Sequence, residues 1–205
     1  MSRLEARGLA VARGDSRLFR DLSFSVADGE WLAVRGANGS GKTTLLRCLA
    51  GLTRPEAGEV LWDGRPARED AAGFRASMLF AGHAPGIKDE FSAEENLASA
   101  LALRSVPADS ASIGEALAAA GLAKRRHLPA RRLSAGQRRR IGMARLALDP
   151  AKLWILDEPL TALDAEGEAL FTGILGRHLA RGGLAVIATH QGLATEGGRE
   201  MRLGA

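Results

Sequence analysis

The stretch that decides the fold is Gly36-Ala37-Asn38-Gly39-Ser40-Gly41-Lys42-Thr43-Thr44. It fits the pattern G-x-x-x-x-G-K-[ST], and it lies between an apolar run at 31–34, typical of a strand, and a helical pattern over 44–50. Three glycines without a Cβ let the backbone curl with its N–H groups pointing inward, close to a phosphate. The positive end of the helix adds to this attraction. The sequence therefore predicts a phosphate-binding loop, and a chance glycine-rich turn is the alternative.

Two side chains at the end of this loop carry specific chemistry. Lys42 can reach the β- and γ-phosphates of a nucleotide, and the Thr43 hydroxyl can ligate Mg²⁺. We expect each residue from Gly36 to Thr44 to contact bound ATP. The sequence thus predicts ATP and Mg²⁺ as ligands.

Polar residues end two later apolar strands. Asp157 and Glu158 follow the run at 153–156, and His190 follows the run at 184–188. Parallel strands place their chemistry at their carboxyl ends. We expect Asp157 to hold Mg²⁺, Glu158 to polarise an attacking water as general base, and His190 to contact the γ-phosphate. The alternatives are an ordinary polar loop start and a structural histidine.

The remaining pattern predicts an α/β fold. Strands are expected at 4–11, 22–26, 59–62 and 77–80, and helices at 93–103, 112–120 and 165–180. A further helix is expected to open with 133–137 and to end at Asp149-Pro150. Ser92 and Glu95 form a capping-box pattern at one helix start. We predict a P-loop NTPase with a mainly parallel core sheet, a small N-terminal antiparallel β part and a helical part. The whole chain, 1–205, is expected to be one domain, with the helical part inserted at about 84–148.

Composition narrows the classes of function. The 205 residues include 28 Lys and Arg against 24 Asp and Glu, with basic clusters at 124–126, 131–132 and 138–140. Almost no aromatic residue interleaves with these clusters, which disfavours single-strand stacking. Cys48 is the only cysteine, so no intrachain disulfide forms, and we expect it to be a small buried residue. We expect neither a secretory signal nor a membrane span.

Several motifs, in their order along the chain, resemble those of the nucleotide-binding subunit of ABC transporters. They are Gly36–Thr43, Leu133–Gln137, Asp157-Glu158, Thr161–Asp164 and His190. The resemblance covers about 4–191 and implies an ATP-dependent homodimer with two ATP molecules at its interface. It implies that Ser134 and Gly136 of one copy close over phosphates held by Lys42 of the other. It also implies that Lys42, Glu158 and His190 carry out hydrolysis.

Three positions depart from that family's pattern. Ala135 replaces the commoner glycine of the family's signature sequence, which in this chain is Leu133–Gln137, and this is a mild change. His83 falls where the family has a glutamine, and by resemblance it would ligate Mg²⁺ or its water, with coupling that could become sensitive to pH. Arg13 falls near the aromatic residue that stacks on adenine, and a guanidinium plane can also stack on a base.

Local phrases resemble one subgroup, the ATP-binding subunit of the haem exporter used in c-type cytochrome maturation. They include Glu59–Trp62, Gly82–Lys88, Leu153–Leu156 and Thr189–Gln191. The resemblance implies integral membrane subunits of that maturation system as partners, contacting the chain near 83–91. It places the chain peripherally on the cytoplasmic face of the bacterial inner membrane, where ATP could drive release of a haem-loaded partner.

Other functions remain as alternatives at this stage. The chain has no C-x-x-C-H motif, so no direct haem ligation is expected. One alternative is the ATPase of another small ABC transporter with a different cargo. A second is a nucleic-acid-associated ABC ATPase, disfavoured because there is one ATPase unit and no coiled-coil insertion, so no nucleic-acid partner is expected. A non-enzymatic nucleotide-binding module is a third, which Glu158 and His190 argue against.

Overall fold

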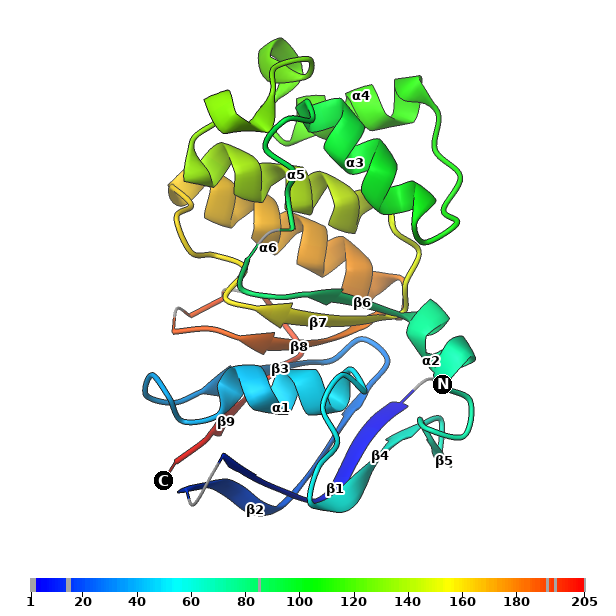
Figure 1. Cartoon of the computed structure of the whole chain (residues 1–205), viewed down its shortest axis with the longest axis vertical. Coiled ribbons are helices and arrows are strands. Elements are labelled where there is room, and N and C mark those ends of the chain that lie inside the picture. The colour runs from blue at the N-terminus through cyan, green and yellow to red at the C-terminus, as the bar shows by residue number, and fades with distance from the viewer. Residues whose placement is uncertain (1–2, 14–15, 85, 191, 194, 205) are drawn as a thin grey trace. The chain divides into compact units, whose positions relative to one another are not determined.

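A computed structural model describes residues 3–13, 16–84, 86–190, 192–193 and 195–204 (Figure 1). The chain divides into two compact units. The first, here the α/β unit, comprises Met1–His83, Ala151–Pro159 and Gly176–Ala205. The second, the helical unit, comprises Ala84–Pro150 and Leu160–Leu175.

A five-stranded sheet forms the centre of the α/β unit. Its order is β6 (Met78–Ala81), β7 (Leu153–Asp157), β8 (Leu184–Ala188), β3 (Trp31–Arg35) and β9 (Gly198–Arg202). Every neighbouring pair is parallel. The predicted parallel core sheet is thus confirmed. Because β7 and β8 are buried along their whole length, they show the continuous apolar runs typical of interior strands.

Helix α1 (Lys42–Leu49) follows the phosphate-binding loop and packs on this sheet (Figure 1). Its buried leucines, Leu45, Leu46 and Leu49, share one core with side chains of β3, β7 and β8. Cys48 on the same helix is buried, as predicted, and burial raises the pKa of its thiol to about 11. The thiol is therefore protonated at neutral pH and acts as a small apolar residue.

A second sheet in the α/β unit is antiparallel throughout. Its order is β2 (Ser16–Ala27), β1 (Arg3–Arg13), β4 (Ala57–Trp62) and β5 (Arg65–Pro66). Leu4 of β1 lies opposite Val26 of β2 on one side and Trp62 of β4 on the other. The predicted N-terminal antiparallel part is confirmed.

Besides the two-residue strand β5, two elements of the α/β unit were not predicted from the sequence. Helix α2 (Ala71–Ser77) buries only Phe74 and contains a glycine, so it shows no helical hydrophobic period. Its start is set by Asp70, whose side chain accepts a hydrogen bond from the Gly73 N–H. Strand β9 is the sheet edge, and only Met201 among its residues is partly buried. Neither element carries the apolar pattern from which sequence analysis starts.

The helical unit contains α3 (Ala93–Ala102), α4 (Ser110–Ala119), α5 (Ala135–Leu148), the first part of α6 (Ala165–Ala180), and two short 3-10 turns, η1 (Ala123–Arg125) and η2 (Ala130–Arg132). Leu97, Leu117 and Ile141 are buried in its core. The predicted capping box at α3 is present: the Glu95 N–H donates to Ser92 Oγ, and the Ser92 N–H donates to a Glu95 carboxylate oxygen.

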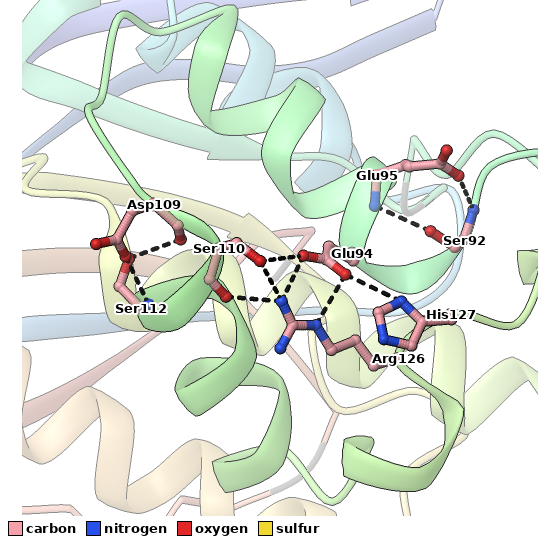
Figure 2. Close-up of polar contacts among 8 residues, drawn as sticks. All are labelled: Ser92, Glu94, Glu95, Asp109, Ser110, Ser112, Arg126 and His127. Atoms are coloured by element: carbon pink, nitrogen blue, oxygen red, sulfur yellow. Dashed lines mark hydrogen bonds and ion pairs between the residues drawn. The ribbon is translucent and has the colours of Figure 1, made fainter.

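A polar network joins the start of α3 to two later segments of the helical unit (Figure 2). Arg126 Nε donates to Glu94 Oε2 at 2.8 Å, and Arg126 also donates to the Ser110 carbonyl. His127 Nδ1 lies 3.1 Å from the same Glu94 carboxylate. Hydrogen bonds from Arg126 and Ser110 lower the pKa of Glu94 to about 2. Glu94 therefore stays ionised at any ordinary pH and holds these segments together.

His178 of α6 is buried against Trp154 of β7, with the two rings stacked at a centroid distance of 3.7 Å. His178 Nε2 lies 3.3 Å from the Leu184 carbonyl oxygen. A Cβ added at Gly183 would lie 2.3 Å from the ring, so glycine is needed there. Burial lowers the pKa of His178 to about 4. The imidazole is therefore neutral in the folded protein at neutral pH.

This buried imidazole predicts an acid-sensitive stability. The unfolded chain protonates His178 near its usual pKa of about 6.5, whereas the folded chain resists protonation down to pH about 4. The contribution of His178 is complete above pH 6.5 and is lost as pH falls towards 4, by up to about 3 kcal/mol. We expect urea unfolding at several pH values to show a shallower acid loss for His178→Phe than for wild type. His127→Phe is the control, because His127 is exposed; equal slopes for all three proteins would contradict the prediction.

Candidate nucleotide-binding and hydrolysis site

The predicted phosphate-binding loop connects the carboxyl end of β3 to the start of α1. Gly36, Gly39 and Gly41 have φ angles of 154°, 83° and 98°, which disfavour residues with a Cβ. A Cβ at Gly36 would lie 2.5 Å from Ser40 Oγ and 2.8 Å from the Leu203 carbonyl oxygen. At Gly39 nothing lies within 4 Å of that position. The loop is therefore packed tightly at its base and open beside Gly39.

Lys42 is folded back over the loop. Its side chain is almost buried, at 8% exposure, and Nζ donates to the Gly36 carbonyl at 2.8 Å and the Ala37 carbonyl at 3.2 Å. Nζ also lies 3.3 Å from His190 Nε2. These three partners match the three hydrogens of the ammonium. A phosphate bound here would exchange some of these acceptors for its own oxygens, which are stronger acceptors.

Thr43 and Asp157 come together from distant parts of the chain. Thr43 Oγ1 donates to Asp157 Oδ2 at 2.8 Å, and Asp157 is only 2% exposed at the end of β7. A hydroxyl beside a carboxylate is the oxygen ligand type that Mg²⁺ prefers. Ser40 Oγ in the same loop is buried and makes no hydrogen bond within the described part of the chain. These groups fit a bound Mg²⁺ and phosphate.

Glu158 and His190 meet beside Lys42. Glu158 has a positive φ of 51°, and its N–H donates to the Ala188 carbonyl at 2.9 Å, at the end of β8. Glu158 Oε1 lies 3.2 Å from His190 Nε2, with side-chain exposures of 17% and 51%. One ring nitrogen cannot donate and accept at the same time. A proton on Nε2 therefore favours Glu158, and a lone pair there favours Lys42.

Arg35 adds a contact that sequence analysis missed. It is the last residue of β3, and its Nη1 donates to the His190 carbonyl at 3.0 Å. Its Nη2 lies 2.7 Å from Glu200 Oε1 on β9. A lone arginine at a strand end carries no motif, and its partners lie more than 150 residues away in the sequence. No signal in the sequence could have identified it.

The signature residues lie in the helical unit. Ser134 is the exposed N-cap of α5, where it forms a capping box with Gln137. A Cβ at Gly136 would lie 2.7 Å from the Ala162 carbonyl oxygen, so this position needs glycine. Ala162 itself has a positive φ of 65°. The start of α5 thus packs directly on the turn at 161–164, which comes later in the chain.

The same helix is tied to the start of α6. Arg140 Nη2 donates to Asp164 Oδ1 at 2.7 Å, and the Gly167 N–H donates to the same oxygen at 2.9 Å. The Gly167 N–H and then Arg140 lower the pKa of Asp164. Several residues of the basic clusters likewise face carboxylates: Arg126 with Glu94, Arg131 with Glu90 and Arg138 with Asp89. Much of the clustered positive charge is therefore compensated inside the helical unit.

Two predicted site residues have less structural detail. His83 is exposed, two residues beyond the end of β6, and no group of three His, Cys, Asp or Glu that could hold a metal is found among the described residues. Arg13 is the last residue of β1, and its side chain lies outside the described part of the structure. Both assignments stay predictions.

Comparison with known proteins agrees with these motifs. A family model described as ABC transporter matches residues 19–161. The chain is 47% identical over 202 residues to "Cytochrome c biogenesis ATP-binding export protein CcmA" of Pseudomonas aeruginosa, covering 98% of this chain and all of the relative. A Salmonella choleraesuis protein named "Putative bifunctional cytochrome c-type biogenesis protein CcmAE" is 51% identical over 190 residues, or 93% of this chain and 55% of that protein.

Solved structures support the fold. A putative ABC transporter ATP-binding protein from Pyrococcus furiosus has a TM-score of 0.83 and 23% identity, covering 97% of this chain and 96% of that one. A dimeric ATP-binding cassette in a post-hydrolysis state with ADP and phosphate also has a TM-score of 0.83, at 22% identity, covering 98% and 94%. The predicted P-loop NTPase fold is confirmed.

Proposed function

Because the chain belongs to the ABC transporter family, we propose that it is the ATP-hydrolysing subunit of a transporter complex in c-type cytochrome biogenesis. The full-length similarity to the Pseudomonas aeruginosa export protein carries the second half of this proposal. The contacts of Lys42, Glu158 and His190 at the strand ends support the first half. In that system the complex would export haem or release a haem-loaded partner, and this chain would power the step.

ATP binding is assigned to the loop residues Gly36–Thr44. Backbone N–H groups of the loop and the α1 N-terminus would hold the β-phosphate, and Lys42 would reach the γ-phosphate. Thr43 and Asp157 would hold Mg²⁺, which when bound neutralises phosphate charge. His83 would approach the metal or its water, and Arg13 would stack on the adenine. Each of these roles is proposed from the residue's chemistry and its place in the motif.

Hydrolysis is assigned to Glu158 and His190. A water attacks the γ-phosphorus in line with the departing ADP oxygen, and Glu158 accepts a proton from that water. His190 Nε2 lies 3.3 Å from Lys42 Nζ and 3.2 Å from Glu158 Oε1, and it can pair with only one of them at a time, so it can sense whether a γ-phosphate is present. Its exposure leaves room for the ring to turn towards a ligand.

We propose that the active form is an ATP-dependent homodimer. The exposed Ser134 and the neighbouring Gly136 lie at the N-terminus of α5, where backbone N–H groups favour an anion. In the dimer they would close over the phosphates bound by the other copy. We also propose that residues 1–205 are one ATPase domain with the helical part inserted at about 84–148.

Integral membrane subunits are the proposed partners, and the inner membrane's cytoplasmic face is the proposed location. In the described residues no helix has both the length and the hydropathy required to span a bilayer. Residues 88–91, just before α3, are a candidate contact surface for these membrane subunits, and Asn96 holds this segment in place. Asn96 accepts from the Lys88 N–H at 2.8 Å and donates to the Phe91 carbonyl at 3.1 Å.

A deletion strain tests the cytochrome assignment. It is complemented with the wild-type gene or with Glu158→Gln, and membrane proteins are stained for covalently bound haem. We expect c-type cytochromes to vanish on deletion and to return only with the wild type. If they persist in the deletion strain, the cytochrome assignment is wrong. The membrane protein that co-purifies with this chain then becomes the candidate partner.

A further inference from the structure

The main chain of His190 is held by one side chain outside the known motifs. Strand β8 ends at Ala188, so His190 lies two residues beyond the sheet ladder. The His190 side chain is about half exposed, so packing alone does not fix its position. Arg35 Nη1 donates to the His190 carbonyl at 3.0 Å, and a hydrogen bond from a charged donor is stronger than one from a neutral donor.

Arg35 is itself fixed on both sides. Its backbone ends β3 immediately before Gly36, so it moves with the phosphate-binding loop. Its second nitrogen, Nη2, lies 2.7 Å from Glu200 Oε1 on the neighbouring strand β9. Glu200 is 56% exposed, and exposed ion pairs contribute little by themselves. The carbonyl bond is therefore the main tie, and Glu200 orients the guanidinium that makes it.

We propose that Arg35 is the positioning residue for His190, so that the two parts of the site that sense the γ-phosphate move as one body. Arg35 reaches from the start of the phosphate-binding loop to the His190 main chain, and the ring of His190 returns to Lys42 at 3.3 Å and Glu158 at 3.2 Å. A shift of the His190 backbone would move Nε2 away from both partners. This inference rests on the proposed hydrolytic role of His190.

The inference predicts a specific change in catalysis. Arg35→Met removes both donors, and misplacing a catalytic group by about 1 Å can cost up to about 100-fold in rate. We expect kcat for ATP hydrolysis to fall about 10- to 100-fold while KM for ATP stays within about twofold. Arg35→Lys keeps a charge but cannot hold both partners, so it should recover part of the rate. Glu200→Gln should cost less than Arg35→Met.

The test is made on the full-length protein with the membrane fraction that contains its partners. Arg199→Met is the matched control: Arg199 on β9 also donates to a backbone carbonyl, that of Ser25, and to the Glu30 carboxylate, and it does not line the hollow that Arg35 shares with His190. The double variant Arg35→Met with His190→Ala should be no slower than His190→Ala alone, because Arg35 acts through His190.

The outcomes separate the two levels of the proposal. A full rate for Arg35→Met, or losses that multiply in the double variant, would overturn the positioning role while the ATPase assignment stands. Absence of ATP hydrolysis in the wild type, or a full rate for His190→Ala, would instead overturn the proposed site. If Arg35→Met lowers thermal stability, the Arg35→Lys and Glu200→Gln variants give the same comparison in a folded protein.

Discussion

Replacing Glu158 with glutamine is expected to stop ATP turnover and to leave ATP binding intact. The amide has the same shape as the carboxylate, and the hydrogen bond from the Glu158 backbone N–H to the Ala188 carbonyl does not depend on the side chain. The amide cannot accept the proton of the attacking water, however, and a positioned general base contributes about 10²- to 10⁴-fold. We therefore expect kcat to fall by about that factor, measured as phosphate release. Equilibrium binding of ATP with Mg²⁺ should change by less than about threefold.

The control for this variant makes the same chemical change elsewhere. Glu69 is exposed in the turn between β5 and α2, outside the motifs of the candidate site, so Glu69→Gln should hydrolyse ATP at the wild-type rate. The trapped Glu158→Gln protein should also accumulate as a dimer in ATP, because the closed state is no longer released by hydrolysis. Wild-type turnover by Glu158→Gln would remove Glu158 from the base role and leave the phosphate-binding loop assignment untouched.

Sequence analysis could predict the candidate site residues because each of them follows a local pattern of glycines or a buried apolar strand. The loop from Gly36 to Thr44 needs glycine for its backbone geometry, and β7 and β8 are buried along their length, so their apolar runs are visible. Asp157, Glu158 and His190 follow those runs directly. In such cases the local backbone requirement and the hydrophobic pattern point to the same place.

The contacts between these motifs could not be predicted. Lys42 folds back on the Gly36 carbonyl, which depends on the exact course of the loop. Arg35 reaches His190 across 155 positions of sequence, and no periodicity records a single long-range hydrogen bond. The exposed strand β9 was missed for a related reason, because an edge strand with one partly buried side chain has no apolar signal. A sequence pattern indicates burial and turns, whereas the contacts of individual side chains depend on the folded structure.

Replacing Lys42 with methionine is expected to weaken ATP binding as well as to stop turnover. Methionine is unbranched and apolar, so it can replace the almost buried lysine stem while removing its charge. A hydrogen bond to a charged group contributes about 1.5–3 kcal/mol, which corresponds to about 10- to 150-fold in ATP affinity. Equilibrium binding measured with and without Mg²⁺ would show this loss.

Two further variants decide why Lys42 matters. Lys42→Arg keeps the charge, but a planar guanidinium is too wide to take the place of the compact ammonium between the Gly36 and Ala37 carbonyls. We therefore expect that it does not restore ATP binding. Lys152→Met is the control, since Lys152 also donates to a backbone carbonyl, that of Gly182, at the opposite end of the strands. If Lys42→Arg binds ATP normally, a positive charge at this position is sufficient, and the fit of an ammonium between the two carbonyls is not required. If Lys42→Met binds ATP as wild type does, Lys42 does not hold the nucleotide, because methionine lacks the ammonium that bonds the Gly36 and Ala37 carbonyls and that would turn to a phosphate.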